Sequence, residues 1–229
     1  MQALKEKIIF NFIEDNRWMY LVDGLKATMI ITVFAVMIGI LLGFLVAVVR
    51  STNEKTGKLK LLNMVCKVYL TVIRGTPVVV QLLIIYFVVF ESVNIDQIIV
   101  ATLAFGFNSG AYVAEIIRSG IMSIDNGQFE AGRSLGFTYP QTMIYIILPQ
   151  AFKNVLPALA NEFIVLLKET SVAGWIGMVD LTKAGTIIQS RTYEPFLPLV
   201  AVALIYLALV MLFTKLVSLL ERRLRNSER

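Results

Sequence analysis

The chain of 229 residues is strongly apolar: 57% of its residues are hydrophobic, 16% are charged, and the formal net charge is +5. Soluble proteins carry about 25% charged residues, so this composition excludes an ordinary soluble domain. Several uncharged runs are as long as a bilayer is thick, which predicts an all-α membrane protein. The modest positive charge does not indicate nucleic-acid binding.

Two residue types limit the chemistry of the chain. It has no histidine, which removes the commonest general base and a common metal ligand. It has one cysteine, Cys66, so an intrachain disulfide is excluded. No Ser/His/Asp set or Cys/His cluster is present, so we predict neither a catalytic nor a metal site, and the chain is not expected to be an enzyme.

Residues 1–20 are predicted to form an amphipathic helix on the membrane surface. Apolar side chains recur there at helical spacing, and Trp18 and Tyr20 follow as interface residues. Acidic residues interrupt the segment, so it is not a cleavable signal peptide. A disordered N-terminal segment is the alternative.

Five membrane-spanning helices are predicted. The first is the clearest, because its 23 residues carry no charge, and its Gly39 and Gly43 allow another helix to approach closely. Further spans are assigned where long apolar runs recur along the chain. The five predicted spans lie near residues 27–49, 61–90, 97–117, 153–169 and 195–215.

Two stretches require separate treatment. Residues Gly75-Thr76-Pro77 fall inside the second span and predict a kink or an unwound turn, because proline has no N–H to donate. Residues 134–152 are uncharged but are not assigned as a span, because Gly136, Pro140 and Pro149 are expected to break a helix there.

Between the third and fourth spans, residues 127–137 predict a short helix outside the bilayer. The helix ends at Gly136, which suits a C-cap, and its adjacent small residues Ala131 and Gly132 allow another surface to approach. The alternative is an ordinary connection between two spans.

The sequence Glu130-Ala131-Gly132, followed by Leu135-Gly136 and later by Leu148-Pro149, resembles the EAA signature of ABC importer permeases. The third position is Gly132 where the signature has alanine. Arg74-Gly75-Thr76-Pro77 and the run from Ser109 to Ile121 are similar to the polar amino-acid uptake class of that family.

This resemblance implies a single ABC transporter transmembrane domain over residues 1–229, with the type I importer permease fold. It implies that residues 127–137 are the coupling helix, which contacts a cytoplasmic ABC ATPase dimer. The other implied partners are a second permease subunit, identical or homologous, an extracytoplasmic substrate-binding protein, the lipid bilayer and a polar amino acid. The residues expected to make the ATPase contact are Glu130, Ala131, Gly132, Leu135 and Gly136.

The chain has no Gly-x-x-x-x-Gly-Lys-Ser/Thr loop, so ATP is expected to bind the partner subunit and the chain itself requires no cofactor. The expected mechanism is alternating access driven by that ATPase. A channel or secondary carrier without an ATPase is the alternative, although five spans without an internal repeat do not suit inverted-repeat carriers.

Polar residues in the third and fourth spans predict a substrate path. Asn108, Glu115, Asn161 and Glu162 lie within apolar segments, where such residues are costly unless they face water or protein. Alternatively, Glu162 pairs with Lys153, Arg118 or Lys168, or holds two permease subunits together. The carboxylates weakly suggest a cationic cargo.

The distribution of basic residues predicts the orientation. With the C-terminus in the cytoplasm, the inner segments hold 11 Lys and Arg residues, Arg225 and Arg229 among them, against 7 in the outer segments. This distribution puts the N-terminus outside and the C-terminus inside, and the resemblance to ABC importer permeases implies a multi-pass protein of the bacterial cytoplasmic (inner) membrane.

Overall fold

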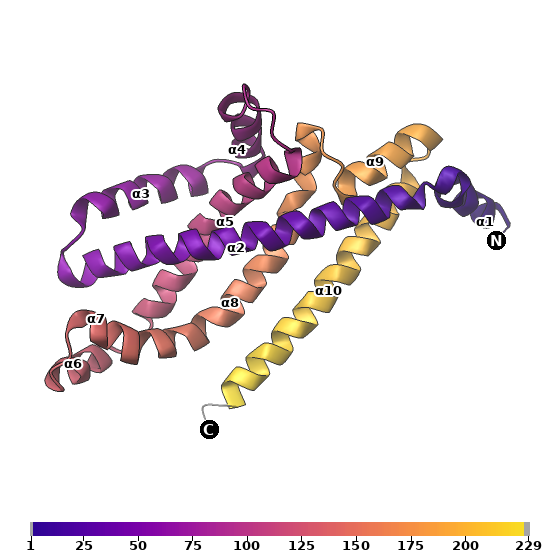
Figure 1. The fold of residues 1–229 in the computed structure, drawn as a ribbon. Coiled ribbons are helices and arrows are strands. Elements are labelled where there is room, and N and C mark those ends of the chain that lie inside the picture. Colours follow the sequence, from indigo (N-terminus) through magenta and orange to yellow (C-terminus); the bar gives the residue numbers. More distant parts are fainter. Residues whose placement is uncertain (1, 227–229) are drawn as a thin grey trace. The chain divides into compact units, whose positions relative to one another are not determined.

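The computed structural model describes residues 2–226, with side chains to residue 224. Of the residues in the predicted orientation, Arg229 and the side chain of Arg225 lie outside this range. The described backbone is almost entirely helical and contains no strand (Figure 1). It divides into two compact units. Of the described residues, the first comprises 2–35, 77–105 and 164–215, and the second comprises 36–76, 106–163 and 216–226.

The N-terminal segment is not the single helix predicted for residues 1–20. Helix α1 covers Gln2–Ile8, a π-helical turn follows at Ile9–Ile13, and α2 begins at Trp18 and extends to Thr56. The chain reverses at Asp15 and Asn16, whose φ angles are 52° and 51°. Arg17 holds this reversal, because its guanidinium donates to the Phe10 carbonyl and pairs with Asp15.

The second unit contains the predicted coupling region, residues 127–137. Its core joins α2, α5 (Gln97–Met122) and α8 (Leu148–Glu169) through an apolar cluster. The buried members of this cluster are Ala47, Val113, Ile117, Ile121, Ile147, Ala151 and Val155. Helix α3 (Lys60–Gly75) packs on the same unit, where Leu70 contacts a second cluster that includes Val46 and Ala114.

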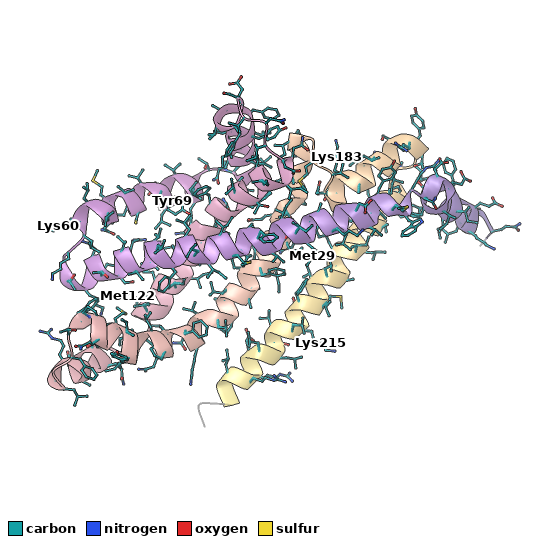
Figure 2. The ribbon with its side chains drawn as sticks, viewed as in Figure 1. Met29, Lys60, Tyr69, Met122, Lys183 and Lys215 are labelled. Carbon is teal, nitrogen blue, oxygen red and sulfur yellow. The ribbon has the colours of Figure 1, made fainter. Side chains whose placement is uncertain are left out.

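The small residues of α2 allow α5 to pack closely, as their spacing predicted. An added Cβ at Gly39 would lie 2.8 Å from the Ser109 hydroxyl, and one at Gly43 would lie 2.6 Å from a Val113 methyl. Tyr69 of α3, labelled in Figure 2, donates to the Phe107 carbonyl at 2.6 Å. These contacts fix α2 and α3 on two sides of the second half of α5.

The break predicted in the second span is confirmed. Helix α3 ends at Gly75, Thr76 and Pro77 are extended, and α4 begins at Val78. The Thr76 hydroxyl donates to the Val72 carbonyl at 2.8 Å and occupies an acceptor at the helix end. Helix α4 (Val78–Ile84) continues into a π-helical turn at Ile85–Val89. Because of the break at Thr76 and Pro77, residues 61–90 are not one continuous helix.

Within the described residues, four helices are long and apolar enough to cross a membrane, or five if the α3–α4 pair is counted as one span. Most of these helices are longer than predicted. Helix α2 exceeds its predicted 27–49 at both ends, and α10 covers Phe196–Asn226 where 195–215 was expected.

Pro149 does not break the helix, contrary to the prediction. Helix α7 (Tyr139–Thr142), a π-helical turn at Met143–Ile147 and α8 follow one another without interruption. In the π turn the Leu148 N–H bonds to the Met143 carbonyl, five residues back. Local π adjustments of this kind re-satisfy backbone groups that proline leaves free in membrane helices. The helical segment therefore begins before the predicted span of 153–169, and it includes part of the uncharged stretch that was not assigned as a span.

The first unit is organised around Asp180, which is fully buried. Its carboxylate caps α9 (Leu181–Thr192) by accepting from the N–H groups of Thr182 and Lys183 at 2.9 and 3.2 Å. An added Cβ at Gly24 of α2 would lie 2.7 Å from the Asp180 carbonyl, so α2 passes directly against this cap. Helix α9 and the 3₁₀ turn at Thr170–Ile176 pack together beside it.

Helix α10 exposes most of its apolar side chains, which project from both sides of the ribbon in Figure 2. Leu204, Leu207 and Met211 are all more than half exposed. A soluble chain rarely exposes so continuous an apolar surface, and a bilayer or a second membrane subunit would cover it.

Candidate functional site

The short helix predicted for residues 127–137 is observed as α6, at Asn126–Ser134. Asp125 begins it by accepting from the Gly127 N–H at 2.6 Å. Gly136 ends it with a φ of 82°, and its N–H bonds to the Arg133 carbonyl while the Phe137 N–H bonds to the Gly132 carbonyl. This pair of bonds is a Schellman motif, which explains why the helix stops three residues before the predicted limit of 137.

Helix α6 is held against its own unit by one polar and one aromatic contact. The Lys55 ammonium at the end of α2 donates to Asn126 Oδ1 at 2.6 Å and lies 4.5 Å from the centre of the Phe129 ring. Phe129 in turn stacks on Tyr139, with ring centres 6.5 Å apart. The helix is therefore a supported projection of the unit.

The predicted coupling residues divide between the two faces of α6. Glu130, Ala131, Leu135 and Gly136 are exposed, with Leu135 at 73%. Gly132 is buried, and a Cβ there would lie 2.7 Å from Thr142 Cγ2 and 2.8 Å from its hydroxyl. Because Gly132 has no side chain, α7 of the same chain packs directly against it. Gly132 therefore does not face outward with the four exposed residues.

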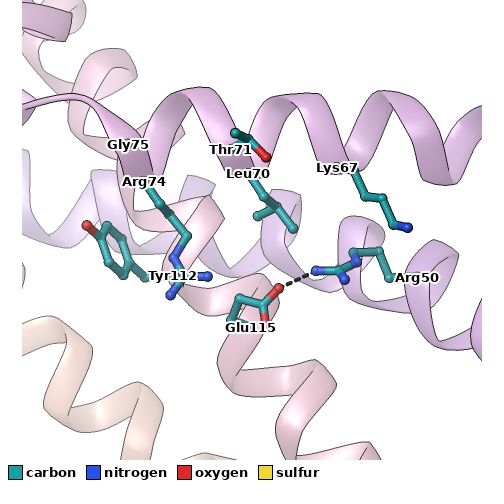
Figure 3. Close-up of a pocket in the computed structure, with 8 residues that line it drawn as sticks. All are labelled: Arg50, Lys67, Leu70, Thr71, Arg74, Gly75, Tyr112 and Glu115. Carbon is teal, nitrogen blue, oxygen red and sulfur yellow. Dashed lines mark hydrogen bonds and ion pairs between the residues drawn. The ribbon is translucent and has the colours of Figure 1, made fainter.

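A cavity of about 600 Å³ lies in the second unit between α2, α3 and α5 (Figure 3). Glu115 is the member of the predicted substrate path that reaches it. In Figure 3 the Glu115 carboxylate lies between Arg50 and Arg74, and Lys67 lies beyond Arg50. The eight lining residues are Arg50, Lys67, Leu70, Thr71, Arg74, Gly75, Tyr112 and Glu115.

Glu115 belongs to a ring of ion pairs that joins α2 to α5. It pairs with Arg50 and, at 2.9 Å, with Arg118. Glu54 closes the ring with contacts of 3.8 Å to Arg50 and 3.5 Å to Arg118. All four side chains are partly buried, with exposed fractions of 16–34%. Two cations and two anions therefore neutralise one another at the edge of the cavity.

The remaining path residues lie away from this cavity. Asn108 and Glu162 are buried, and the Ser109 hydroxyl donates to Glu162 at 3.0 Å, so α5 and α8 meet there through polar side chains. Asn161 is exposed and does not share the buried face of its neighbour Glu162. Arg118, one suggested partner of Glu162, instead forms ion pairs with Glu115 and Glu54.

Sequence reasoning missed four residues of the cavity: Arg50, Lys67, Arg74 and Tyr112. Arg50 was counted only in the orientation, Lys67 was noted only as a charge within the second span, and Arg74 only as part of a motif. One signal was available, since Lys67 and Arg74 are seven residues apart and so lie on the same face of α3.

The helices, the exposed apolar surface and the supported projection α6 define a helical membrane transport subunit. Residues 39–226 match the family model described as "binding-protein-dependent transport system inner membrane component". The chain belongs to this family. It is a permease subunit of an ABC importer and an inner-membrane protein with several spans. Proteins of this family act with an ATPase and a binding protein, so the chain is a transport subunit and not an enzyme.

Individual relatives are similar over nearly their whole length. A putative glutamine transport system permease of Rickettsia bellii is 37% identical over 90% of this chain and 93% of its own length. The arginine transport system permease of Bacillus subtilis is 37% identical over 91% and 94%. A chain from a crystal structure of an amino acid ABC transporter with histidines is 45% identical, with a TM-score of 0.83 over 93% of this chain and 98% of that chain.

Proposed function

We propose that this chain forms the translocation path of an importer for polar amino acids. A separate ATPase dimer binds and hydrolyses ATP and drives alternating access through α6. The relatives described above are named for glutamine and arginine transport, which supports an amino acid as the cargo. The observation that carries the coupling role is the exposed face of α6 on a helix that both caps and side-chain contacts hold in place.

The proposed ATPase contact consists of Glu130 and Ala131 of α6 together with Leu135 and Gly136 directly after it, all of which are exposed. Gly132 contributes indirectly, because its missing side chain lets α6 lie against Thr142. A rigid projection transmits a displacement of the ATPase to the unit, whereas a flexible loop would absorb it.

The cavity beside Glu115 is the proposed part of the substrate path. It combines charged and aromatic groups in a segment that otherwise faces an apolar environment, and such groups are tolerated where they face water or protein. Glu162 is proposed to support this path through the hydrogen bond that it accepts from Ser109, which joins α5 to α8, and the neighbouring Asn108 is assigned to the same buried region. Asn161, on the exposed surface, is assigned to contact a second permease subunit.

The proposed assembly contains two permease subunits, identical or homologous, two ATPase subunits and an external binding protein. The N-terminus lies outside and the C-terminus in the cytoplasm. This orientation requires α3 and α4 together to cross the membrane once, and it places α6 on the ATPase side.

Reconstitution tests the proposal. The permease, its ATPase and its binding protein are placed in liposomes, and uptake of radiolabelled glutamine and arginine is measured with and without ATP. The proposal requires uptake of at least one amino acid that depends on both ATP and the binding protein. Uptake of equal rate without ATP would show a channel or secondary carrier, and would contradict the proposal.

Two variants test whether α6 transmits the motion of the ATPase. Ala131→Trp enlarges the exposed contact and should reduce ATP-dependent uptake at least tenfold while the chain remains inserted. Tyr193→Trp, at a position that is 92% exposed and distant in sequence, is the control and should retain uptake. Equal uptake by both variants would remove α6 from the coupling role.

A further inference from the structure

The charges around the cavity beside Glu115 do not cancel. Arg50 and Glu115 are both occupied in the ring of ion pairs, which is neutral as a whole. Lys67 and Arg74 also line the cavity, and neither forms an ion pair with a carboxylate of the described residues. The cavity therefore carries two positive charges in excess.

Helix α3 itself supplies no negative charge to balance these two cations. It contains no acidic residue, and Lys67 and Arg74 lie two turns apart on one face, with Leu70 and Thr71 between them. Arg74 lies over the Tyr112 ring, 5.6 Å from its centre, which fixes the guanidinium at one end of the cavity. Charges within a membrane segment are costly unless they face water or a partner of opposite charge.

We propose that Arg74 binds the α-carboxylate of the transported amino acid and that Lys67, two turns away on α3, adds positive charge to this anion subsite. The inference rests on the proposed function and specifies its substrate class as compounds that carry a free carboxylate. A guanidinium donates two parallel hydrogen bonds to a carboxylate, and an ammonium adds a compact charge, so the pair suits this group.

The carboxylates in the sequence weakly suggested a cationic cargo, and the proposed anion subsite argues against that suggestion. Glu115 is already neutralised by Arg50 and Arg118, so it is not available to a cationic side chain. Amino acids with a neutral or acidic side chain therefore fit the cavity at least as well as arginine does. An amine without a carboxylate does not fit, because it would meet only uncompensated positive charge.

Binding to the purified permease–ATPase complex, without the binding protein, tests the subsite. Each probe amino acid is compared with the amine that remains when its carboxylate is removed: L-glutamine with 4-aminobutanamide, and L-arginine with agmatine. The complex should bind at least one amino acid and bind the matching amine at least tenfold more weakly. Equal binding within both pairs would overturn the inference, and so would no binding of either amino acid.

Variants assign the effect to the two cations. Lys67→Gln and Arg74→Gln should each weaken amino-acid binding roughly tenfold or more, which is the usual effect of losing a hydrogen bond to a charged group. Arg74→Lys keeps the charge but not the paired donors, so it should bind amino acids more tightly than Arg74→Gln and more weakly than the unchanged complex. Lys60→Gln, on the same helix but outside the cavity, is the matched control and should bind as the unchanged complex does.

The outcomes separate the subsite from the proposed function. If both Gln variants bind amino acids normally while ATP-dependent uptake persists in liposomes, the subsite is wrong and the importer stands. If the liposomes show no ATP-dependent uptake of amino acids, the proposed function fails, whatever the binding shows. Should Arg74→Gln fail to assemble, the Lys67→Gln result decides the question.

Discussion

Gly132 of α6 lies directly against Thr142 of α7, and no side chain fits between them. An added Cβ at Gly132 would lie 2.7 Å from Thr142 Cγ2 and 2.8 Å from the Thr142 hydroxyl, both closer than real contacts allow. The same hydroxyl donates to the Thr138 carbonyl at 3.1 Å, so it is not free to move away. The small residue in the sequence motif therefore builds the hairpin of α6 and α7.

This relationship predicts the effect of Gly132→Ala. Forcing one methyl group into a packed contact costs about 1–3 kcal/mol, so the variant should unfold at a lower temperature than the unchanged complex. Adding Thr142→Ala removes both atoms that clash and should restore much of the lost stability. Thermal unfolding of the four combinations in detergent measures the coupling between the two positions, and additive losses would contradict the contact.

A second prediction concerns the ring of ion pairs. Glu115→Arg places like charges beside Arg50 and Arg118 and should destabilise the complex, and Arg50→Glu should do so beside Glu54 and Glu115. The double variant restores an opposite-charge contact and should recover about 0.5–3 kcal/mol relative to the sum of the single losses. The unfolding temperatures in detergent give this difference. No recovery would show that the pair contributes nothing.

The third prediction concerns the crossing of α3 and α4. If the pair crosses the membrane once, residues on either side of it face opposite compartments. In a background with Cys66→Ala, Val93→Cys should react with a membrane-impermeant maleimide in intact cells, because Val93 is exposed and the proposed orientation puts its loop outside. Lys58→Cys should react only after the membrane is opened. Reaction of both positions from one side would show a re-entrant pair and would reverse the orientation of every later helix.

The fourth prediction follows from Asp180. Its burial raises the pKa of its carboxyl above the ordinary value, although the N–H groups of Thr182 and Lys183 favour the ionised form. The folded chain then holds the proton more tightly than the unfolded chain. Its contribution to stability is greatest in acid and declines as the pH rises from about 3.9 through the raised pKa.

Asp180→Asn keeps a good capping group but cannot ionise. Between pH 4 and 7 the unfolding temperature of the Asn variant, relative to that of the unchanged chain, should therefore increase as the pH rises. Asp180→Ala should be less stable at every pH, by about 1 kcal/mol or more, because the cap is lost. Parallel curves for the Asn variant and the unchanged chain would contradict the role given to burial.

Local chemistry made part of this structure predictable from sequence. Pro77 cannot continue a hydrogen-bonded helix and Gly136 adopts a left-handed backbone, so the break after α3 and the end of α6 followed from residue type. The helix break predicted at Pro149 was wrong because a π turn before it lets the helix continue. No sequence pattern indicated that turn.

Tertiary placement accounts for the rest. Arg50 and Glu54, and likewise Glu115 and Arg118, have the spacing of local ion pairs on a helix. That spacing does not reveal that α2 meets α5, which joins the two pairs into one ring. The inward direction of Gly132 and the outward direction of Asn161 likewise depend on which helix lies alongside, and one sequence does not contain that information.

Cross-linking of α6 to the ATPase tests the central claim most directly. In the Cys66→Ala background, Leu135→Cys is treated in cells with a cross-linker that reacts with this thiol at one end and with lysine amines of a neighbouring protein at the other, and the product is probed for the ATPase subunit. Leu135 is 73% exposed at the end of α6, and Tyr193→Cys, at 92% exposure in the predicted outer segment, is the control. The account predicts a permease–ATPase product from Leu135→Cys and none from Tyr193→Cys. A product from Tyr193→Cys and none from Leu135→Cys would contradict it.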